Sequence, residues 1–576
     1  MRPFPRALLL AANAILFSLP ALNASAGCFR YAPGSPVIEP EDLYSKNGVL
    51  TVSMSYQTST DSNGNRLFCY VLPDGNQSPT LHIKPGDSLV LTITNDTPVP
   101  AQSDAMQMQV SPPDQCGAAT MNGSSTNVHF HGTNTAPVCH QDEVIHTLIN
   151  SGESFTYNVQ FPTDEPPGEY WYHPHVHGLS EMAVLGGATG ALIVDGIENL
   201  QHAVTGLPQR VLVVRDNVVP GDPDTPPAPA KDVSLNFVPI PYPSYPPAVI
   251  TMNAGASEFW RVANTSADTV IDVQLQYDRK PQLVQIVALD GVPVGSQDGS
   301  GRGQLLPATH VLIPPAGRGE FIVQSPGPKV KVAQFVTRNV DTGPGGDLDP
   351  ARPLANIQTT KSIVSAQAIP KMPIQWGLPN PQRFVGLLEA RVTNKRKLYF
   401  SETETEPQTF FITVDGQTPV AFNPDLPPAI TTTQGSVEQW TIENRTSEVH
   451  AFHIHQIHYL LEAVNGIPVP PGQRQFFDTV DVPYWTGKGP YPSITVRMDF
   501  RGPVVGDFVY HCHILEHEDG GMMAIIRVLP QGSNLNAATP ASPGVSKIKQ
   551  VLAPTTRAPL CRSGKLVKAA YTSGGL

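Results

Sequence analysis

Twelve of the 17 histidines lie in four short segments, where they recur every second to fourth residue. On a β-strand, side chains two residues apart point to the same face, so a His-x-His pair can offer two imidazoles to one metal ion. One such pair also suits a plain strand surface, but four pairs in one chain predict metal binding. The segments are Asn127-Val-His129-Phe-His131-Gly132, Trp171-Tyr-His173-Pro-His175-Val-His177-Gly178, His450-Ala-Phe-His453-Ile-His455-Gln-Ile-His458 and His511-Cys512-His513-Ile-Leu-Glu-His517-Glu-Asp-Gly-Gly-Met522-Met523.

Cys512 indicates which metal is bound. It stands between two histidines, with His517 five residues further on and Met522 five beyond that, while His450 offers a second imidazole. Two histidines, one cysteine and a weak axial methionine form the trigonal blue-copper site that transfers electrons. Zinc is the alternative metal, but it prefers a closed tetrahedral site of nitrogen, oxygen and thiolate ligands. A buried disulfide at Cys512 is the structural alternative, which the flanking histidines disfavour.

The composition describes a globular, acidic chain of 576 residues. Charged residues make up 15% and hydrophobic residues 40%, and the net charge of -12 disfavours binding to nucleic acid. Arg2 and Arg6 precede an apolar run at 7–22, and Ala24-Ser25-Ala26 resembles a signal-peptide cleavage site. We therefore expect a secreted or periplasmic protein with no membrane anchor after signal removal. The five cysteines other than Cys512 can form at most two disulfides, whose pairing stays open.

A ten-residue motif occurs three times along the chain. Each copy has a turn glycine, a strand and an asparagine that can end the strand, so each repeat predicts one β-domain. Strand alternation, 60 prolines and the lack of a long amphipathic helix predict an all-β chain of sandwiches. The copies start 169 and 180 residues apart and read Gly86-Asp-Ser-Leu-Val-Leu-Thr-Ile-Thr-Asn95, Gly255-Ala-Ser-Glu-Phe-Trp-Arg-Val-Ala-Asn264 and Gly435-Ser-Val-Glu-Gln-Trp-Thr-Ile-Glu-Asn444.

The four histidine segments resemble the copper signatures of the multicopper oxidases, the family of laccases, ascorbate oxidases, bilirubin oxidases and bacterial copper-efflux oxidases. The resemblance covers about residues 45 to 530 and implies three cupredoxin-like Greek-key β-sandwich domains. Phe130 and Ala451 differ from the family's most frequent residues, but neither stands at a ligand position. We expect a signal peptide at 1–26, cupredoxin domains at 27–200, 201–375 and 376–535, and a C-terminal tail at 536–576.

The resemblance also implies four copper ions in each chain. The type 1 copper takes His450, Cys512 and His517, with Met522 as its axial ligand. The type 2 copper takes one histidine from each matched set, His129 and His453. The type 3 pair takes the remaining six, which are His131, His173, His175, His455, His511 and His513.

The second repeat predicts a domain without copper. When the asparagines that end the second and third repeats are matched, Val270, Val273 and Leu275 take the places of three predicted ligand histidines. Aliphatic side chains cannot bind copper, so this domain is expected to be a spacer that holds the first and third domains together. In the first repeat Pro174 takes the place of Cys512, which leaves that domain without a type 1 site.

The expected activity is the one-electron oxidation of phenols or aromatic amines, as in laccases, coupled to four-electron reduction of dioxygen to water. A metallo-oxidase acting on Cu(I) or Fe(II) is the first alternative, although Met106, Met108 and Met121 are thin support for it. Bilirubin oxidase and ascorbate oxidase activities are further alternatives. A copper storage protein would not need Cys512 to join two sites, and a copper nitrite reductase would need fewer histidines. We expect a monomer whose partners are dioxygen and a small reducing substrate.

Two carboxylates are candidates for the proton supply that reduction of dioxygen requires. Asp142 follows the first histidine segment, where the family has a carboxylate near its water channel. Glu518 directly follows His517, where similar oxidases carry an acid implicated in proton delivery. The alternative role for both is to orient a ligand imidazole through a hydrogen bond. The extra histidines His177 and His458 are expected to form hydrogen bonds rather than to bind copper.

Overall fold

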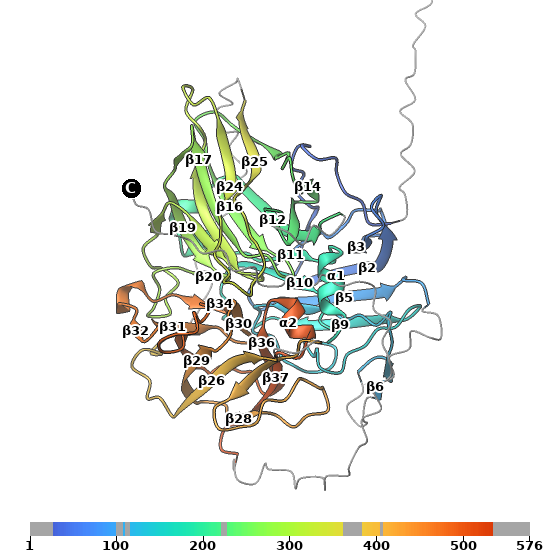
Figure 1. Ribbon diagram of the computed structural model, residues 1–576, viewed down its shortest axis with the longest axis vertical. Coiled ribbons are helices and arrows are strands. Elements are labelled where there is room, and N and C mark those ends of the chain that lie inside the picture. The colour runs from blue at the N-terminus through green and yellow to red at the C-terminus, as the bar shows by residue number, and fades with distance from the viewer. Residues whose placement is uncertain are drawn as a thin grey trace, which may run out of the picture.

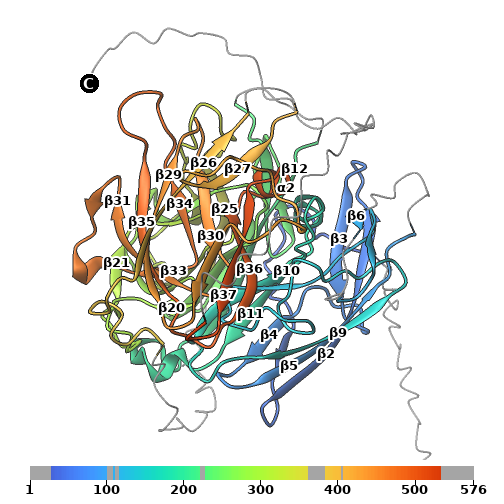
Figure 2. The same ribbon diagram turned by 90° about the horizontal axis from the view of Figure 1, so that it is seen from below.

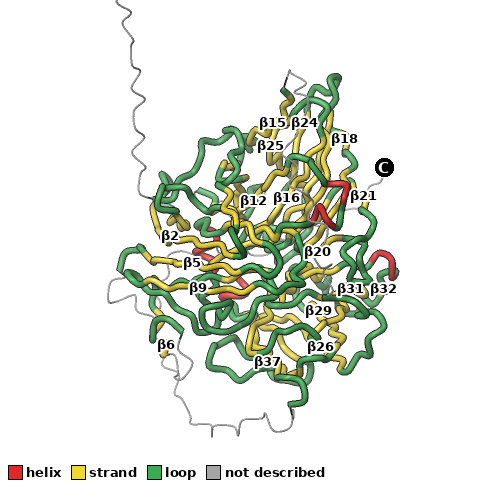
Figure 3. Tube along the Cα trace, turned by 180° about the vertical axis from the view of Figure 1, so that it is seen from behind, coloured by secondary structure: helices red, strands yellow, loops and turns green. Residues whose placement is uncertain are grey.

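The computed structural model describes residues 27–99, 108–109, 116–220, 227–360, 383–403 and 407–533. The predicted signal peptide, the C-terminal tail with Cys561, and Met106 lie outside these residues. Nearly all regular elements within them are β-strands, so the all-β prediction is confirmed. No helix among the described residues has the length and apolar character needed to cross a membrane. Figure 3 shows how little of the chain is helical.

The first sandwich packs two sheets around a core that includes Leu91, Ile93 and Tyr157. One sheet has the order β3 (Arg66–Val71), β2 (Val49–Thr60), β5 (Ser88–Asn95) and β9 (Ser154–Gln160). The other has the order β1 (Asp42–Tyr44), β4 (Thr80–Ile83), β11 (Gly190–Val194), β10 (Gly168–His173) and β8 (His129–His131). The hairpin pair β6 (Met108–Gln109) and β7 (Thr120–Met121) lies apart from both sheets.

The second sandwich has the largest sheet, whose strand order is β14 (Val238–Ile240), β13 (Lys231–Leu235), β12 (Gln209–Val218), β16 (Ser257–Asn264), β23 (Arg318–Gln324), β19 (Val284–Leu289) and β20 (Val292–Pro293), with β21 (Leu306–Ala308) beside β19. It packs on the sheet β15 (Ala248–Met252), β25 (Arg352–Thr359), β24 (Ala333–Thr337), β17 (Ile271–Tyr277) and β18 (Lys280–Pro281), with β22 (Val311–Ile313) beside β17. Val273 and Leu275 belong to the core between these sheets.

The third sandwich carries two of the histidine segments. Its larger sheet has the order β27 (Phe410–Val414), β26 (Asn394–Glu402), β29 (Val437–Asn444), β35 (Ser493–Asp499), β31 (Tyr459–Val464) and β32 (Ile467–Pro468), with β33 (Phe476–Phe477) beside β31. The other sheet has the order β28 (Ile430–Thr433), β37 (Met523–Leu529), β36 (Gly506–Cys512), β30 (His450–Ile454) and β34 (Thr479–Val482).

The three sandwiches meet at the histidine segments. In Figure 1 the second sandwich (green to yellow) lies above, the first (blue to cyan) at the lower right and the third (orange to red) at the lower left. The short helices α1 (Ser180–Leu185) and α2 (Leu515–Asp519) touch where the three meet. Figure 2 shows β36 beside β10, which brings the third domain against the first. The remaining helical turns are η2 (Ile197–Asn199), η3 (His202–Val204) and η4 (Pro471–Gln473).

The repeated motif occupies the same position in each sandwich. Its strands β5, β16 and β29 each pair in parallel with the first long strand of their domain and antiparallel with a later one. The asparagines that end them, Asn95, Asn264 and Asn444, are fully buried. Each side-chain amide donates to two backbone carbonyls at 2.7–3.2 Å, and each side-chain oxygen accepts the backbone N–H two residues later. The asparagine therefore ends the strand and holds the loop that follows.

Two disulfides tie down the first domain. They join Cys28 to Cys69 and Cys116 to Cys139. Cys512 is buried and forms no disulfide with any of the described cysteines, so the disulfide alternative is wrong for this part of the chain.

Replacing Asn264 with Ala tests the role of the repeated asparagine in the second domain. The carbonyls of Thr269 and Ile313 would be left buried without their donor, and each unsatisfied group costs about 1–3 kcal/mol. We expect the calorimetric unfolding temperature to fall by roughly 5 °C. Asn63→Ala, in an exposed turn, is the control, and equal unfolding temperatures for both variants would contradict the prediction.

Candidate metal centre

The structure gathers the predicted ligand histidines into four buried groups. In each group the candidate ligand atoms lie within 4.8 Å of one another. Three groups contain residues of both the first and third domains, and one belongs to the third domain alone. The groups are His129, His131 and His453; His131, His173 and His513; His175, His455 and His511; and His450, Cys512 and His517.

The group around Cys512 has the soft donor set predicted from the sequence. The Nδ1 atoms of His450 and His517 lie 2.9 Å apart, and the Cys512 sulfur lies 3.5 Å and 3.6 Å from them. The opposite nitrogens have other partners, because His450 Nε2 meets the Thr446 hydroxyl at 2.8 Å and His517 Nε2 meets Glu448 at 3.2 Å. The rings are thereby turned so that one nitrogen of each faces the sulfur.

Met522 is tied by its backbone to His517 and Cys512. Its backbone N–H donates to the carbonyl of His517 at 2.9 Å, and its carbonyl accepts the N–H of Cys512 at 3.1 Å. Its side chain is fully buried in the third-domain core. The neighbouring Met523 lines a cavity instead, which favours Met522 over Met523 as the axial residue.

Four of the other histidines share a second pattern. In each ring one nitrogen faces an acceptor: His129 Nδ1 meets Asp142 at 3.0 Å, His131 Nε2 meets Asp478 at 3.2 Å, His173 Nδ1 meets the Pro174 carbonyl at 2.8 Å, and His453 Nδ1 meets the Asp478 carbonyl at 2.9 Å. The remaining nitrogen of each ring is buried and has no hydrogen-bond partner among the described residues. These unpartnered nitrogens are the atoms that a metal ion would satisfy.

A third pattern occurs in the group of His175, His455 and His511. Their Nε2 atoms converge, with His511 lying 3.3 Å from His175 and 3.1 Å from His455. Three ring nitrogens aimed at one point cannot all be satisfied by donating to one another. A cation at their centre would bind all three.

Burial keeps these groups uncharged. It is the largest cause that lowers the pKa of the imidazoles, to about 3 for His511 and His517 and well below the usual value for His129 and His131. Burial also raises the pKa of the Cys512 thiol. Neutral imidazoles are metal ligands, and a buried thiolate needs a nearby cation, so the donor set fits copper.

Both predicted carboxylates lie against ligand rings. Asp142 is buried and accepts hydrogen bonds from His129, the Phe130 N–H at 3.0 Å and, across the domain boundary, Gln456 at 2.6 Å. Glu518 is fully buried, with one oxygen 3.1 Å from His511 Nδ1. Burial raises the pKa of Asp142 to about 8.

Sequence reasoning missed three residues of the site. Gln456 stands inside the third histidine segment and Glu448 two residues before His450, so their place in the motifs could have singled them out. Asp478 directly follows Phe476-Phe477, and no local pattern distinguishes it from the other acidic residues of the chain.

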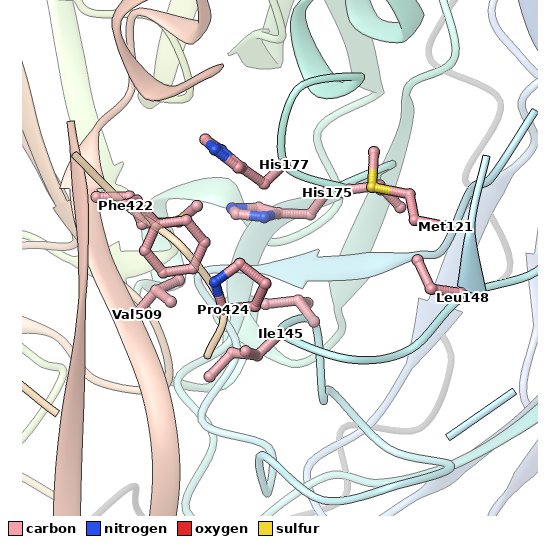
Figure 4. A pocket seen from close by; sticks show the side chains of 11 residues that line it. Met121, Ile145, Leu148, His175, His177, Phe422, Pro424 and Val509 are labelled. Atoms are coloured by element: carbon pink, nitrogen blue, oxygen red, sulfur yellow. The ribbon is translucent and has the colours of Figure 1, made fainter. Parts of the chain in front are cut away.

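The extra histidines do not enter the four groups. His458 Nε2 meets the Asp290 carbonyl at 2.8 Å, as expected. The expected hydrogen bond is not found at the buried Nδ1 of His177, which has no partner among the described residues. The ring instead packs edge-on against Phe422 at 4.9 Å and lines a cavity of about 30 Å³ between the first and third domains. Figure 4 shows His175 and His177 from the first domain facing Phe422 and Pro424 from the third, with Met121 beyond them.

The sequence matches known families at the same segments. A family profile described as multicopper oxidase matches residues 391–532, and a second of the same description matches residues 119–199. A laccase of Bacillus stratosphericus is 25% identical over 406 residues, which cover 63% of this chain and 72% of the relative. Multicopper oxidase LPR1 homolog 5 of Oryza sativa subsp. japonica is 21% identical over 515 residues, covering 78% and 74%.

Solved structures share the fold at lower sequence identity. The 2F4 variant of the multicopper oxidase McoA from Aquifex aeolicus has a TM-score of 0.62 and 17% identity, covering 86% of this chain and 99% of that one. A multicopper oxidase from Campylobacter jejuni, described as a metallo-oxidase, has a TM-score of 0.60 and 20% identity, covering 86% and 96%. The prediction of three cupredoxin-like sandwiches is thereby confirmed.

Both profiles, the laccase relatives and the shared fold support the assignment of the chain to the multicopper oxidase family. The relatives support an oxidoreductase, and the family implies copper together with dioxygen and a reducing substrate.

Cys512→Ser tests the soft-metal group. A serine hydroxyl is a hard, weak ligand, so we expect the copper-loaded variant to lose the blue absorption of a copper–thiolate site and its oxidase turnover. The histidine groups that lack Cys512 should keep most of their copper, measured as copper per chain. Blue absorption in the variant would show that another residue supplies the thiolate.

Proposed function

We propose that this chain is a laccase-like oxidase that couples one-electron oxidation of phenols or aromatic amines to four-electron reduction of dioxygen to water. The observation that carries the proposal is the placement of Cys512 in one buried group and of its sequence neighbours His511 and His513 in two others. A non-catalytic copper-storage protein would have no use for such a link. The laccase relatives support the substrate class.

We assign four copper ions to the four groups, and bound copper would supply the single-electron redox chemistry. His450, Cys512 and His517 would hold the type 1 ion with Met522 as axial ligand, and His129 and His453 the type 2 ion. The type 3 pair would take two sets of three, namely His131, His173 and His513, and His175, His455 and His511. These two sets coincide with two of the groups of converging atoms.

The backbone around Cys512 supplies the electron path. Cys512 ends the extended strand β36, so its side chain and those of His511 and His513 point in opposite directions. The His513 N–H donates to the Ala451 carbonyl at 2.7 Å, which holds this segment against β30. Three covalently joined residues therefore connect electron entry to the histidines that would hold the trinuclear ions.

The cavity beside His175 supports a route for dioxygen. It is lined mainly by apolar side chains from two domains, including Val144, Val176 and Phe422. A volume of about 30 Å³ has room for a molecule of the size of water or dioxygen. We assign entry of the reducing substrate's electron to the type 1 group, because Cys512 joins that group to the other histidines.

A metallo-oxidase is the second candidate, and the charge beside His517 favours it. Glu448 contacts His517 Nε2 at 3.2 Å, and Glu402, Glu516 and Asp347 lie near enough to Glu448 to help raise its pKa, after burial as the main cause. Glu516 is exposed and the Asp347 side chain is 41% exposed, so the cluster opens to solvent. Lys231 pairs with Asp347 at 3.4 Å, but the acids outnumber it, and such an acidic edge attracts Cu(I) or Fe(II).

We propose that the protein is secreted or periplasmic, because the disulfides Cys28–Cys69 and Cys116–Cys139 are of a kind that persists in oxidising compartments.

Comparing substrates at several ionic strengths distinguishes a laccase-like enzyme from a metallo-oxidase. Turnover of a dimethoxyphenol, an aromatic diamine, Cu(I) and Fe(II) is measured by oxygen uptake, with and without added copper. For a laccase-like enzyme we expect the phenol to be oxidised without added copper and with a kcat/KM that changes little with salt. A metallo-oxidase would favour the metal ions, with a kcat/KM that falls as salt screens the acidic edge. Strong stimulation of phenol turnover by added Cu(II) after full loading would count against the laccase assignment.

Asp142→Asn and Glu518→Gln test proton supply. If the two carboxylates relay protons, both variants should hold four copper ions and reduce the type 1 site at the wild-type rate. Steady-state turnover should fall by roughly 10²-fold or more, most severely at high pH where protons are scarce. Copper loss would instead mean that the carboxylate orients its histidine, the role that the three hydrogen bonds of Asp142 favour. Wild-type turnover across the pH range in both variants would exclude a relay.

A further inference from the structure

The second domain sends one charged side chain into the junction of the three domains. Arg318, at the start of β23, has a fully buried side chain. Its Nε donates to the Glu169 carbonyl of the first domain at 3.1 Å, and Nη1 donates to the Ala316 carbonyl at 3.0 Å. Nη1 and Nη2 form a two-pronged pair with the Asp478 carboxylate of the third domain at 2.8 Å and 2.6 Å. A copper-free domain thus contacts both copper-binding ones through a single guanidinium.

Asp478 is the residue through which Arg318 reaches the histidines. One oxygen of its carboxylate lies 3.2 Å from His131 Nε2, and its backbone carbonyl lies 2.9 Å from His453 Nδ1. The opposite nitrogens, His131 Nδ1 and His453 Nε2, are the ones without a partner among the described residues. Asp478 therefore orients one ring from the first domain and one from the third, both in the same group of three.

A second residue of the middle domain holds the backbone of Asp478. The Asp290 carboxylate accepts the N–H groups of Asp478 at 3.2 Å and of Thr479 at 3.1 Å, and also the N–H of Arg318 at 2.9 Å. The carbonyl and the carboxylate of Asp478 are thus both positioned from the second domain.

The glycine that follows His131 leaves room for this ion pair. Gly132 has a φ of +82°, and a Cβ there would lie 2.5 Å from both Arg318 Nη2 and Asp478 Oδ2. The chain thus passes directly against the ion pair as it leaves the ligand His131.

The same domain contains a buried ion pair that touches no histidine. Arg261 of β16 pairs with Glu320 of β23, and both side chains are almost completely buried. Glu320 also accepts the Glu169 N–H of the first domain at 2.8 Å. This pair matches the Arg318–Asp478 pair in burial and in joining domains, but it does not reach the metal groups.

We propose that Arg318 is a positioning residue for the trinuclear copper histidines, acting through Asp478 on His131 and His453. The inference rests on the proposed function. Without the guanidinium, the Asp478 carboxylate would be buried without its ion-pair partner, and it would turn or draw in water. Either change would release His131 Nε2 and leave the carbonyl that faces His453 held only through the Asp290 contacts. Partners behind metal ligands of this kind affect metal affinity by roughly 10- to 100-fold.

The test measures copper retention in the full-length, copper-loaded protein. Wild type, Arg318→Met, Arg318→Lys, Asp478→Asn and the control Arg261→Met are dialysed against a graded copper chelator. Copper per chain, the type 2 paramagnetic resonance signal and the blue absorption are followed. We expect Arg318→Met and Asp478→Asn to lose the type 2 signal at roughly 10- to 100-fold lower chelator concentration while the blue absorption remains. Arg318→Lys should lose the type 2 signal at an intermediate chelator concentration, because lysine keeps the positive charge but lacks the planar guanidinium that binds both carboxylate oxygens.

The control separates positioning from general loosening of the domain junction. Arg261→Met should lower thermal stability yet keep the type 2 signal at wild-type chelator concentrations. If Arg318→Met and Asp478→Asn retain the signal as the control does, or if the control loses it as they do, the proposal is wrong. If Arg318→Met does not fold, the chelator concentrations at which Asp478→Asn and Arg318→Lys lose the type 2 signal decide the test. A wild-type protein that is not blue and does not hold four copper ions would refute the proposed function instead.

Discussion

Buried, uncharged imidazoles with nitrogens aimed at shared points are the feature on which the rest of the structure depends. The nitrogens of His129, His131, His173 and His453 have no partner among the described residues, and those of His175, His455 and His511 face one another. Both arrangements are unfavourable unless a cation takes water's place. The folded chain tolerates this because the other nitrogen of most rings is tied to an acceptor, such as Asp142 for His129 or the Pro174 carbonyl for His173. Ring orientation is therefore set before any metal arrives.

The domain arrangement follows from that requirement. Three of the four groups contain histidines of both the first and the third domain, so the two domains must be held face to face to form them. Gln456 crosses from the third domain to Asp142 of the first. The second domain contributes no ligand to the four groups, yet Asp290 and Arg318 hold the turn that carries Asp478. The sequence predicts that this domain holds the other two together, but it does not indicate that Arg318 and Asp290 reach the residue behind two of the histidines.

The group of His450, Cys512 and His517 differs from the three groups made only of histidines in its surroundings. It lies within one domain, and Phe410 and Phe400 pack against its His517 and His450 rings. Its outer edge is acidic and opens to solvent at Glu516, whereas the cavity near His175 is apolar and small. The two contrasting openings fit a protein in which electrons enter at one place and dioxygen at another.

The sequence by itself determined the β-class, the three repeats and the identity of the clustered histidines and Cys512. These features depend on local spacing: alternation along a strand, a glycine and an asparagine at fixed offsets, and a cysteine between two histidines. Val273 and Leu275 in the second core could likewise be assigned from the repeat alignment. Tertiary structure decided which histidines share a group, which cysteines pair, and which residues orient the rings. Arg318 is 160 residues from Asp478, and Asp478 is 347 from His131. Contacts that distant are set by how whole sandwiches pack, and no local pattern in the chain encodes them.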